Sequence, residues 1–137
     1  LNGIKFTSNN FMEMIECIRF DGGRFDILNG FDEMLLCGMA VGARGGVGST
    51  YNYSLRTYQN IYDAFMAGDL EQARAAQQES VDIVHVIINH GGGIRGGKAS
   101  MKLVGIDCGD CRLPLAPYTE AEIARLDEEL RAIGFKK

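Results

Sequence analysis

The first half of the chain alternates between short apolar runs and segments of helical periodicity. Residues 3–6, 25–28 and 45–48 are predicted to be strands, and the third of these is rich in glycine. Their ends recur about every 20 residues, which is the size of a compact βα unit. Strands that alternate with helices predict an α/β fold with a parallel sheet and right-handed crossovers, either a barrel or a doubly wound sheet.

A helix is predicted after each strand. Ser8 or Asn9 is expected to cap the first helix, Asp32 the second and Ser54 the third, because short polar side chains accept the free amides of a first turn. The faces expected to pack inward are Phe11, Ile15 and Ile18 in the first helix, Leu35, Leu36 and Met39 in the second, and Leu55, Tyr58, Ile61, Tyr62 and Phe65 in the third.

After residue 68 the pattern becomes purely helical. A long helix is predicted to begin at Asp69 and to end at Gly91, and a glycine-rich turn over 91–97 to lead to a shorter helix over 99–104. A loop over 107–117 follows. Thr119 and Glu122 have the spacing of a capping box for the last helix, which Gly134 ends.

Length and charge limit the function classes. The 137 residues suit one domain, and the hydrophobic fraction of 46% is ordinary. The net charge is -4 and the cations are scattered, which argues against a nucleic-acid groove and against a polybasic membrane contact. The longest apolar stretch, 83–88, is far too short to span a bilayer.

The cysteines and the first residue bear on the cellular context. Cys17, Cys37, Cys108 and Cys111 show no disulfide framework, and free thiols in a reducing cytosol are the simplest interpretation. The chain begins with Leu and a strand follows at once, so we expect the natural N-terminus to be missing.

Candidate chemistry gathers where the predicted strands end. Polar clusters occupy 5–8, 29–33 and 48–52. In a parallel βα array the carboxyl ends of the strands lie on one face, where the active sites of such barrels are found. Three separated segments are therefore predicted to meet in one pocket.

Lys5 lies within the first strand, between Ile4 and Phe6. Strand alternation turns it away from both neighbours, toward the interior if the sheet closes into a barrel. A lysine there would be desolvated, and a neutral amine can attack a ketone to form an imine that acts as an electron sink. The alternative is an ordinary strand lysine whose ammonium reaches solvent.

The later clusters also have two interpretations. Asp32 and Glu33 suit a helix N-terminus, yet adjacent carboxylates also bind the hydroxyls of a polyol. Gly48 lets a ligand approach the backbone beside Ser49, whereas close packing of small residues is the alternative.

Two further motifs are assigned no catalytic role. The spacing of Gly91, Gly93 and Gly96 matches a dinucleotide fingerprint but follows a predicted helix rather than a strand, so it is interpreted as a helix stop and turn. Cys108 and Cys111 form one isolated pair, which lacks the second pair of a zinc ribbon.

Taken together, the motifs 3–7, 29–33 and 48–52 resemble the N-acetylneuraminate lyase branch of the dihydrodipicolinate synthase superfamily. The Gly-Ile-Lys start is common to the superfamily, whereas the Asp32–Glu33 pair and the 49–52 run are more specific to the lyase branch. The resemblance extends through the 112–115 loop to the C-terminal helices.

This resemblance implies a (β/α)8 TIM barrel, of which the chain holds only the C-terminal part. Residues 1–68 would be βα units 6 to 8, and 69–137 a helical extension of the same domain. Lys5 would form a Schiff base, and reversible cleavage of the sugar acid would give pyruvate and N-acetylmannosamine. The family's substrate contacts correspond to Thr7, Gly30, Asp32, Glu33 and Ser49.

The resemblance also implies partners. No metal or organic cofactor is implied, a cytoplasmic homotetramer is usual, and the missing N-terminal half-barrel, which carries the catalytic Tyr, is expected to be required. Phe31 stands where Tyr is common, so one hydroxyl contact is expected to be lost. The rivals are a sibling 2-keto acid aldolase or dehydratase and a non-catalytic fragment that keeps the pocket wall.

Overall fold

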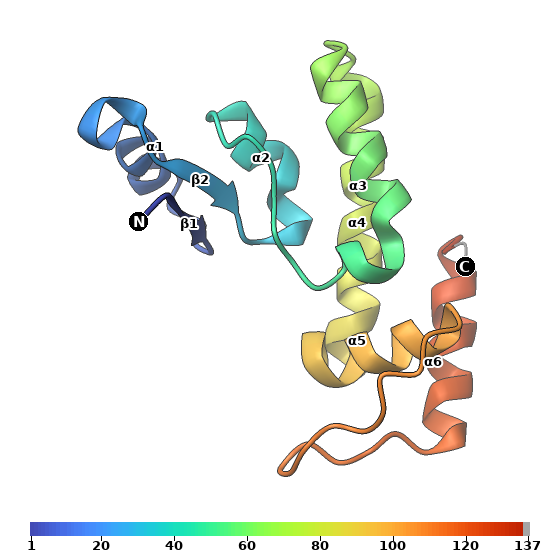
Figure 1. Ribbon diagram of the computed structural model, residues 1–137. Helices are drawn as coiled ribbons and strands as arrows, with labels where there is room; N and C mark the ends of the chain where they lie inside the picture. Colours follow the sequence, from blue (N-terminus) through green and yellow to red (C-terminus); the bar gives the residue numbers. More distant parts are fainter. Residues whose placement is uncertain (136–137) are drawn as a thin grey trace.

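The computed structural model describes residues 1–135, in which two short strands lie side by side at one end of the molecule (Figure 1). Strand β1 (Gly3–Phe6) pairs in parallel with β2 (Asp26–Asn29), and Lys5 is in register with Leu28. The predicted third strand is wrong in extent, because only Gly46 forms a bridge to Asn29. That bridge is parallel, so the three segments still run in one direction.

The connections after β1 and β2 are helical, but two predicted caps are wrong. Helix α1 (Phe11–Arg19) is capped by Asn10, whose side chain accepts the amide of Glu13, and the 3-10 turn η1 (Phe20–Gly23) follows it. After β2 come the 3-10 turn η2 (Asp32–Met34) and α2 (Leu35–Ala40). Asp32 does not cap them, because its carboxylate binds Thr50 instead.

Helix α3 (Tyr51–Met66) begins earlier than predicted. Ser54 lies inside the helix rather than at its cap, and its backbone (φ -132°, ψ 36°) kinks the first turn. The Ser54 hydroxyl pairs with that of Thr57 at 2.9 Å. The kink and the start at Tyr51 together bring the 48–50 segment close to η2.

The second half is helical, as predicted. Helix α4 (Leu70–Asn89) is capped by Asp69 and lies along α3, and Gly91 ends it in the left-handed conformation (φ 94°). The predicted glycine-rich turn is wrong, since α5 spans Gly92–Leu103. A β-carbon at Gly96 would lie 3.1 Å from the Ile87 carbonyl oxygen, so glycine permits the close approach of α5 to α4.

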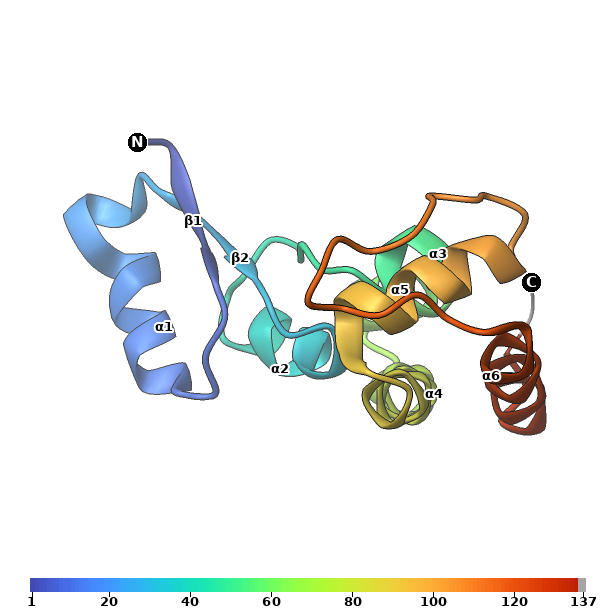
Figure 2. The ribbon, with the colours of Figure 1, turned by 90° about the horizontal axis from the view of Figure 1, so that it is seen from below.

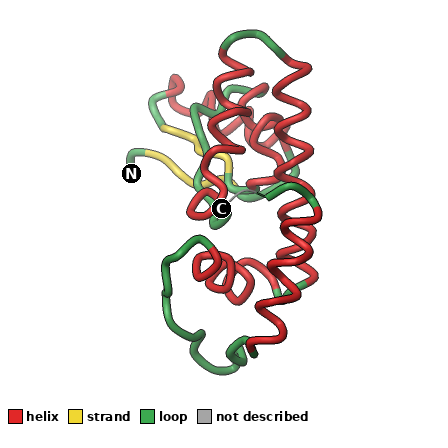
Figure 3. The backbone as a smooth tube through the Cα atoms, turned by 90° about the vertical axis from the view of Figure 1, so that its right-hand side faces the viewer, coloured by secondary structure: helices red, strands yellow, loops and turns green. Residues whose placement is uncertain are grey.

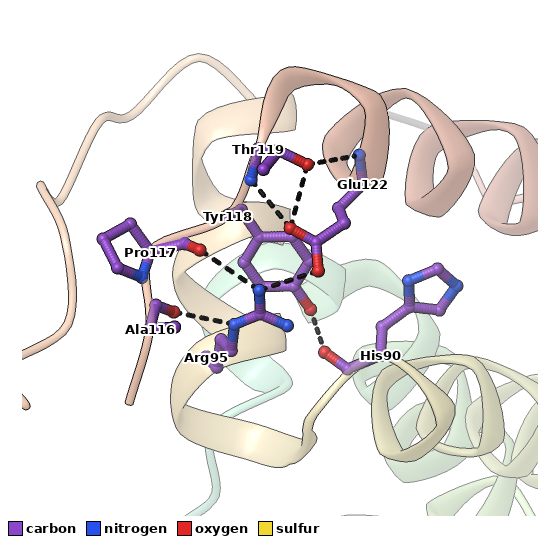
Figure 4. A network of polar contacts seen from close by, with 7 residues as sticks. All are labelled: His90, Arg95, Ala116, Pro117, Tyr118, Thr119 and Glu122. Atoms are coloured by element: carbon purple, nitrogen blue, oxygen red, sulfur yellow. Dashed lines mark hydrogen bonds and ion pairs between the residues drawn. The ribbon is translucent and has the colours of Figure 1, made fainter. Parts of the chain in front are cut away.

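The last helix, α6 (Glu120–Ala132), opens with the predicted capping box of Thr119 and Glu122. A long loop joins it to α5 and is seen in green at the lower end of Figure 3. Arg95 holds this loop: its guanidinium lies over the Tyr118 ring and donates to the carbonyls of Ala116 and Pro117 (Figure 4). The same guanidinium forms an ion pair with Glu122 at 2.9 Å.

Three apolar clusters hold together the elements whose order from the strands to α6 can be followed in Figure 2. Met14 and Ile27 form the first, between α1 and β2, and Leu35 and Ile61 belong to the second. The third joins α3, α4, α5 and α6; its buried members are Tyr53, Ile83, Val86, Ile87, Ala99, Leu126, Leu130 and Phe135. Within residues 1–135, no helix has both the length and the apolar character needed to cross a bilayer.

Several predicted core residues are exposed instead. Ile15 of α1 is exposed, and Leu55 and Tyr62 of α3 are 53% and 41% exposed. Ile15 lies on α1, the helix beside β1. Leu55 and Tyr62 lie on α3, the helix that follows the Gly46 bridge in the chain. Apolar surface therefore remains uncovered on helices flanking both ends of the three-segment sheet.

Candidate functional site

Lys5 lies on the side of the sheet turned away from α1. Its register partner is Leu28. The residue before it, Ile27, packs against Met14 of α1, and because side chains alternate along a strand, Leu28 and Lys5 point to the opposite face. The predicted orientation is thus confirmed, but the predicted burial is not, because the Lys5 side chain is exposed. Three parallel segments cannot enclose a barrel interior, so desolvation of this amine requires further strands.

Thr7 and Gly30 lie together where β1 and β2 end. The Gly30 amide donates to the Phe6 carbonyl at 2.8 Å. A β-carbon at Gly30 would lie 2.0 Å from Thr7 Oγ1, so only glycine allows the hydroxyl this position. The exposed Thr7 hydroxyl therefore lies against the backbone of Gly30, which has no side chain, at the carboxyl end of the sheet.

Asp32 is buried and holds the segment that follows the third sheet position. Its Oδ2 accepts hydrogen bonds from the amide of Thr50 at 2.9 Å and from the Thr50 hydroxyl. A β-carbon at Gly48 would lie 1.4 Å from Asp32 Oδ1, so the carboxylate fills the space that a side chain would need. Asp32 is only 6% exposed, and both of its oxygens face the 48–50 segment.

Glu33 and Ser49 are the accessible members of the two later clusters. Glu33 is half-buried and Ser49 exposed, whereas their neighbours Asp32 and Thr50 are buried. The Ser49 hydroxyl lies near the start of α5, 3.3 Å from the position of a β-carbon on Gly93. The structure therefore brings the predicted contacts to one edge and separates a buried carboxylate from a half-buried one.

Three residues that matter for this edge were not predicted as part of it: Tyr58, Gln77 and Ser80. Tyr58 OH lies 2.5 Å from Thr50 Oγ1, and Ser80 Oγ lies 3.2 Å from Tyr58 OH. Burial raises the pKa of Tyr58 to about 12, so its hydroxyl keeps its proton at neutral pH. Ser80 and Gln77 also approach the Asp32 carbonyl, each at 3.4 Å. These three lie within α3 and α4, where periodicity predicts packing and gives no sign of a polar network.

The chemistry open to this edge is that of an amine, hydroxyls and carboxylates. Across residues 1–135, no three His, Cys, Asp or Glu side chains are grouped so as to hold a metal ion. Cys108 and Cys111 are free thiols in the loop before α6, far along the chain from this edge. Lys5 can act as a nucleophile, while Thr7, Glu33 and Ser49 can bind hydroxyl groups.

Known proteins share this architecture. The chain is 36% identical to an N-acetylneuraminate lyase of Mus musculus and 37% identical to that of Gallus gallus. These alignments cover 97% and 96% of the chain but only 42% and 43% of the relatives. The chain thus spans less than half the length of these relatives.

Solved structures agree with the sequence relatives. The N-acetylneuraminate lyase of Proteus mirabilis superposes with a TM-score of 0.92 at 37% identity, covering 99% of this chain and 46% of that one. The enzyme of Aliivibrio salmonicida gives the same TM-score and identity, with 45% of its chain covered. Residues 1–133 match the Dihydrodipicolinate synthetase family. The chain therefore belongs to this family and forms part of its TIM-barrel fold.

Proposed function

We propose that this chain supplies the imine-forming part of a carbon–carbon lyase, with Lys5 as the nucleophile. The observation that carries the proposal is the position of Lys5, on the face of β1 turned away from α1 and in register with β2. At the ends of these strands lie a hydroxyl seated on Gly30 and an accessible carboxylate, Glu33. An amine beside hydrogen-bonding groups for a hydroxylated chain suits retro-aldol cleavage of a 2-keto sugar acid.

The proposed substrate is N-acetylneuraminate, cleaved reversibly to pyruvate and N-acetylmannosamine. The names of the Mus musculus, Gallus gallus and Proteus mirabilis relatives support this choice. The Lys5 amine would attack the C2 ketone with loss of water, and the protonated imine would take up the electron pair of the breaking C3–C4 bond while the C4 hydroxyl gives its proton to a base outside this chain. Protonation of the resulting enamine at C3 and hydrolysis of the imine would then release pyruvate and regenerate Lys5. Thr7, Gly30, Asp32, Glu33 and Ser49 would bind the hydroxylated chain.

The activity is proposed for a completed barrel. In this chain β1 pairs only with β2 among residues 1–135, and the amine is exposed. The apolar flanks, represented by Ile15 on α1 and by Leu55 and Tyr62 on α3, are where the missing strands and helices would pack. Closure would remove water from Lys5 and favour its neutral, nucleophilic form.

Borohydride trapping tests the proposal. The chain is incubated with pyruvate and sodium borohydride, alone and together with the segment of the Proteus mirabilis lyase that it does not cover, and is then digested and analysed by mass spectrometry. A reduced pyruvyl adduct is expected on Lys5 in the completed enzyme, and none in a Lys5→Arg variant. Because Lys98 and Lys102 are present in the same chain, an adduct found equally on them would indicate non-specific reaction.

The outcomes separate the alternatives. Absence of an adduct on Lys5 in the completed enzyme overturns the imine mechanism. An adduct without release of pyruvate from N-acetylneuraminate favours a sibling aldolase or dehydratase of the same family.

A further inference from the structure

A buried chain of hydroxyl groups connects the helical extension to the carboxylate of Asp32. Ser80 on α4, Tyr58 on α3 and Thr50 at the start of α3 are 0%, 3% and 3% exposed. Consecutive oxygens lie 3.2 Å apart from Ser80 to Tyr58 and 2.5 Å apart from Tyr58 to Thr50. The chain ends at Asp32 Oδ2, to which the Thr50 hydroxyl donates.

The number of available protons orients this chain. An ionised carboxylate only accepts hydrogen bonds, so the single hydroxyl hydrogen of Thr50 points to Asp32. Tyr58, which stays protonated, must then donate to Thr50 Oγ1. Ser80 can donate to Tyr58 in turn. Each hydroxyl therefore both accepts and donates a hydrogen bond, and each of these bonds is donated in the direction of the Asp32 carboxylate.

This arrangement fixes the Asp32 carboxylate in one orientation. Its Oδ2 accepts the Thr50 amide at 2.9 Å as well as the hydroxyl, and its Oδ1 faces Gly48. A carboxylate so engaged fixes the 48–50 backbone against η2. Glu33, next to Asp32, and the exposed Ser49, next to Thr50, lie on either side of the Asp32–Thr50 contact and remain accessible.

We propose that Thr50 and Tyr58 are positioning residues for sugar recognition. They hold Asp32 and the 48–50 segment together, so that Glu33 and Ser49 present their oxygens to the hydroxylated end of the substrate. The same bonds, made through Oδ2, also fix the orientation of the Asp32 carboxylate. The inference rests on the proposed lyase function and adds which residues set affinity for the sugar portion, as opposed to the keto acid portion bound at Lys5.

The test uses the chain completed by the uncovered Proteus mirabilis segment, with N-acetylneuraminate as substrate and pyruvate release as the signal. Thr50→Val removes the hydroxyl at nearly constant shape, and its loss is expected to raise KM about ten-fold while kcat changes by less than about three-fold. Thr50→Ser keeps the hydroxyl and is expected to restore KM to within about two-fold. Tyr58→Phe is expected to raise KM about three-fold or more.

Thr57→Val is the matched control, because Thr57 is also a buried threonine of α3 but its hydroxyl bonds to Ser54 and Glu79 rather than to the chain that leads to Asp32. Its KM is expected to equal that of the wild type. The rate of Lys5 trapping with pyruvate alone is expected to be the same in all four variants, since pyruvate does not reach the sugar end.

Two results overturn the inference while leaving the lyase proposal intact: an unchanged KM in Thr50→Val and Tyr58→Phe, or a KM in Thr50→Ser as high as in Thr50→Val. If Thr50→Val does not fold, Tyr58→Phe, which loses only one oxygen, decides the question. A wild-type enzyme that forms no Lys5 adduct refutes the proposed function itself, and the inference with it.

Discussion

Gln77 of α4 accepts a hydrogen bond from the backbone amide of Leu36 at 2.8 Å and so joins the helical extension to the first turn of α2. Its amide nitrogen lies 3.4 Å from the Asp32 carbonyl and 3.2 Å from the Ser80 hydroxyl. One side chain therefore satisfies backbone groups on both sides of the 3-10 turn η2. The turn that carries Asp32 and Glu33 depends on α4, which lies more than 40 residues later in the sequence.

Replacing Gln77 by Leu should destabilise the chain. The amide of Leu36 would lose its partner and the carbonyl of Asp32 one of its two, at a half-buried position and at a cost of about 1–3 kcal/mol in the free energy of unfolding. Urea denaturation followed by circular dichroism measures this change. The matched control is Gln78→Leu, since Gln78 is exposed and bonds only to Asp82 on its own helix. Equal midpoints for the two variants would contradict the assigned role of Gln77.

A methyl group at residue 48 should disturb the site. In Gly48→Ala the new β-carbon would meet Asp32 Oδ1 at 1.4 Å, and the carboxylate would have to leave Thr50. Overpacking of this kind costs about 1–3 kcal/mol, which thermal unfolding would show as a lower Tm.

Gly45→Ala provides the control for that substitution. Its β-carbon would lie 3.8 Å from Leu28 Cδ2, which is ordinary van der Waals contact. Its Tm should stay close to that of the wild type. A Gly45→Ala variant as unstable as Gly48→Ala would show that the segment tolerates no side chain at all, whatever Asp32 does.

Acid should weaken the junction between α5 and α6. Bonding to the Thr119 amide, to Arg95 and to the Thr119 hydroxyl lowers the pKa of Glu122 to about 2 from its ordinary value of 4.5. A carboxyl group with a depressed pKa in the folded state stabilises the fold above 4.5, and this contribution is lost as the pH falls from 4.5 toward 2.

The difference in Tm between wild type and Glu122→Gln measures that contribution. It should be largest near neutral pH, shrink below pH 4.5 and vanish near pH 2. Glu120→Gln, in the same first turn of α6, is the control for a general charge effect. A difference for Glu122→Gln that does not change with pH would contradict the ion-pair explanation.

A charge on the outer face of α3 should prevent completion of the barrel without unfolding the chain. Leu55 is 53% exposed, so Leu55→Asp should leave the helix content unchanged while burying a charge in the complex with the uncovered lyase segment. Size-exclusion chromatography of the mixture should show separate components. Ile94→Asp, at a residue 67% exposed on α5, should associate normally, and failure of both variants would argue against this face as the contact.

The elements predicted best from the sequence are those whose signals are local. Asp69 and Thr119 were predicted as caps because their partners lie three residues away, as Gln72 and Glu122 do. Asp32 has the same capping chemistry, yet its partner Thr50 is 18 residues distant, and only the fold brings the two together. A local bond made the caps at Asp69 and Thr119 predictable, although the first cap is Asn10 rather than Ser8 or Asn9, and Asp32 was wrong because its bond is tertiary.

The site shows the same division. The position of Lys5, Thr7, Gly30, Asp32, Glu33 and Ser49 at strand ends could be predicted, because parallel strands bring their carboxyl ends to one edge. Apolar periodicity correctly placed Tyr58 and Ile61 in the core but assigned Leu55 and Tyr62 to it as well. Periodicity defines a face of a helix and cannot say whether this chain or another segment covers it.

The outer edge of β1 has a consequence for how the chain behaves at different concentrations. Its backbone groups on that side are not paired within residues 1–135, and a parallel strand can offer them to any other strand of suitable direction. The rate of pairing with a second copy rises with the square of the chain concentration. The rate of pairing with a different segment rises in proportion to the chain concentration and to the segment concentration. Dilution in the presence of excess completing segment therefore favours the mixed assembly, and overproduction of the chain alone favours aggregation.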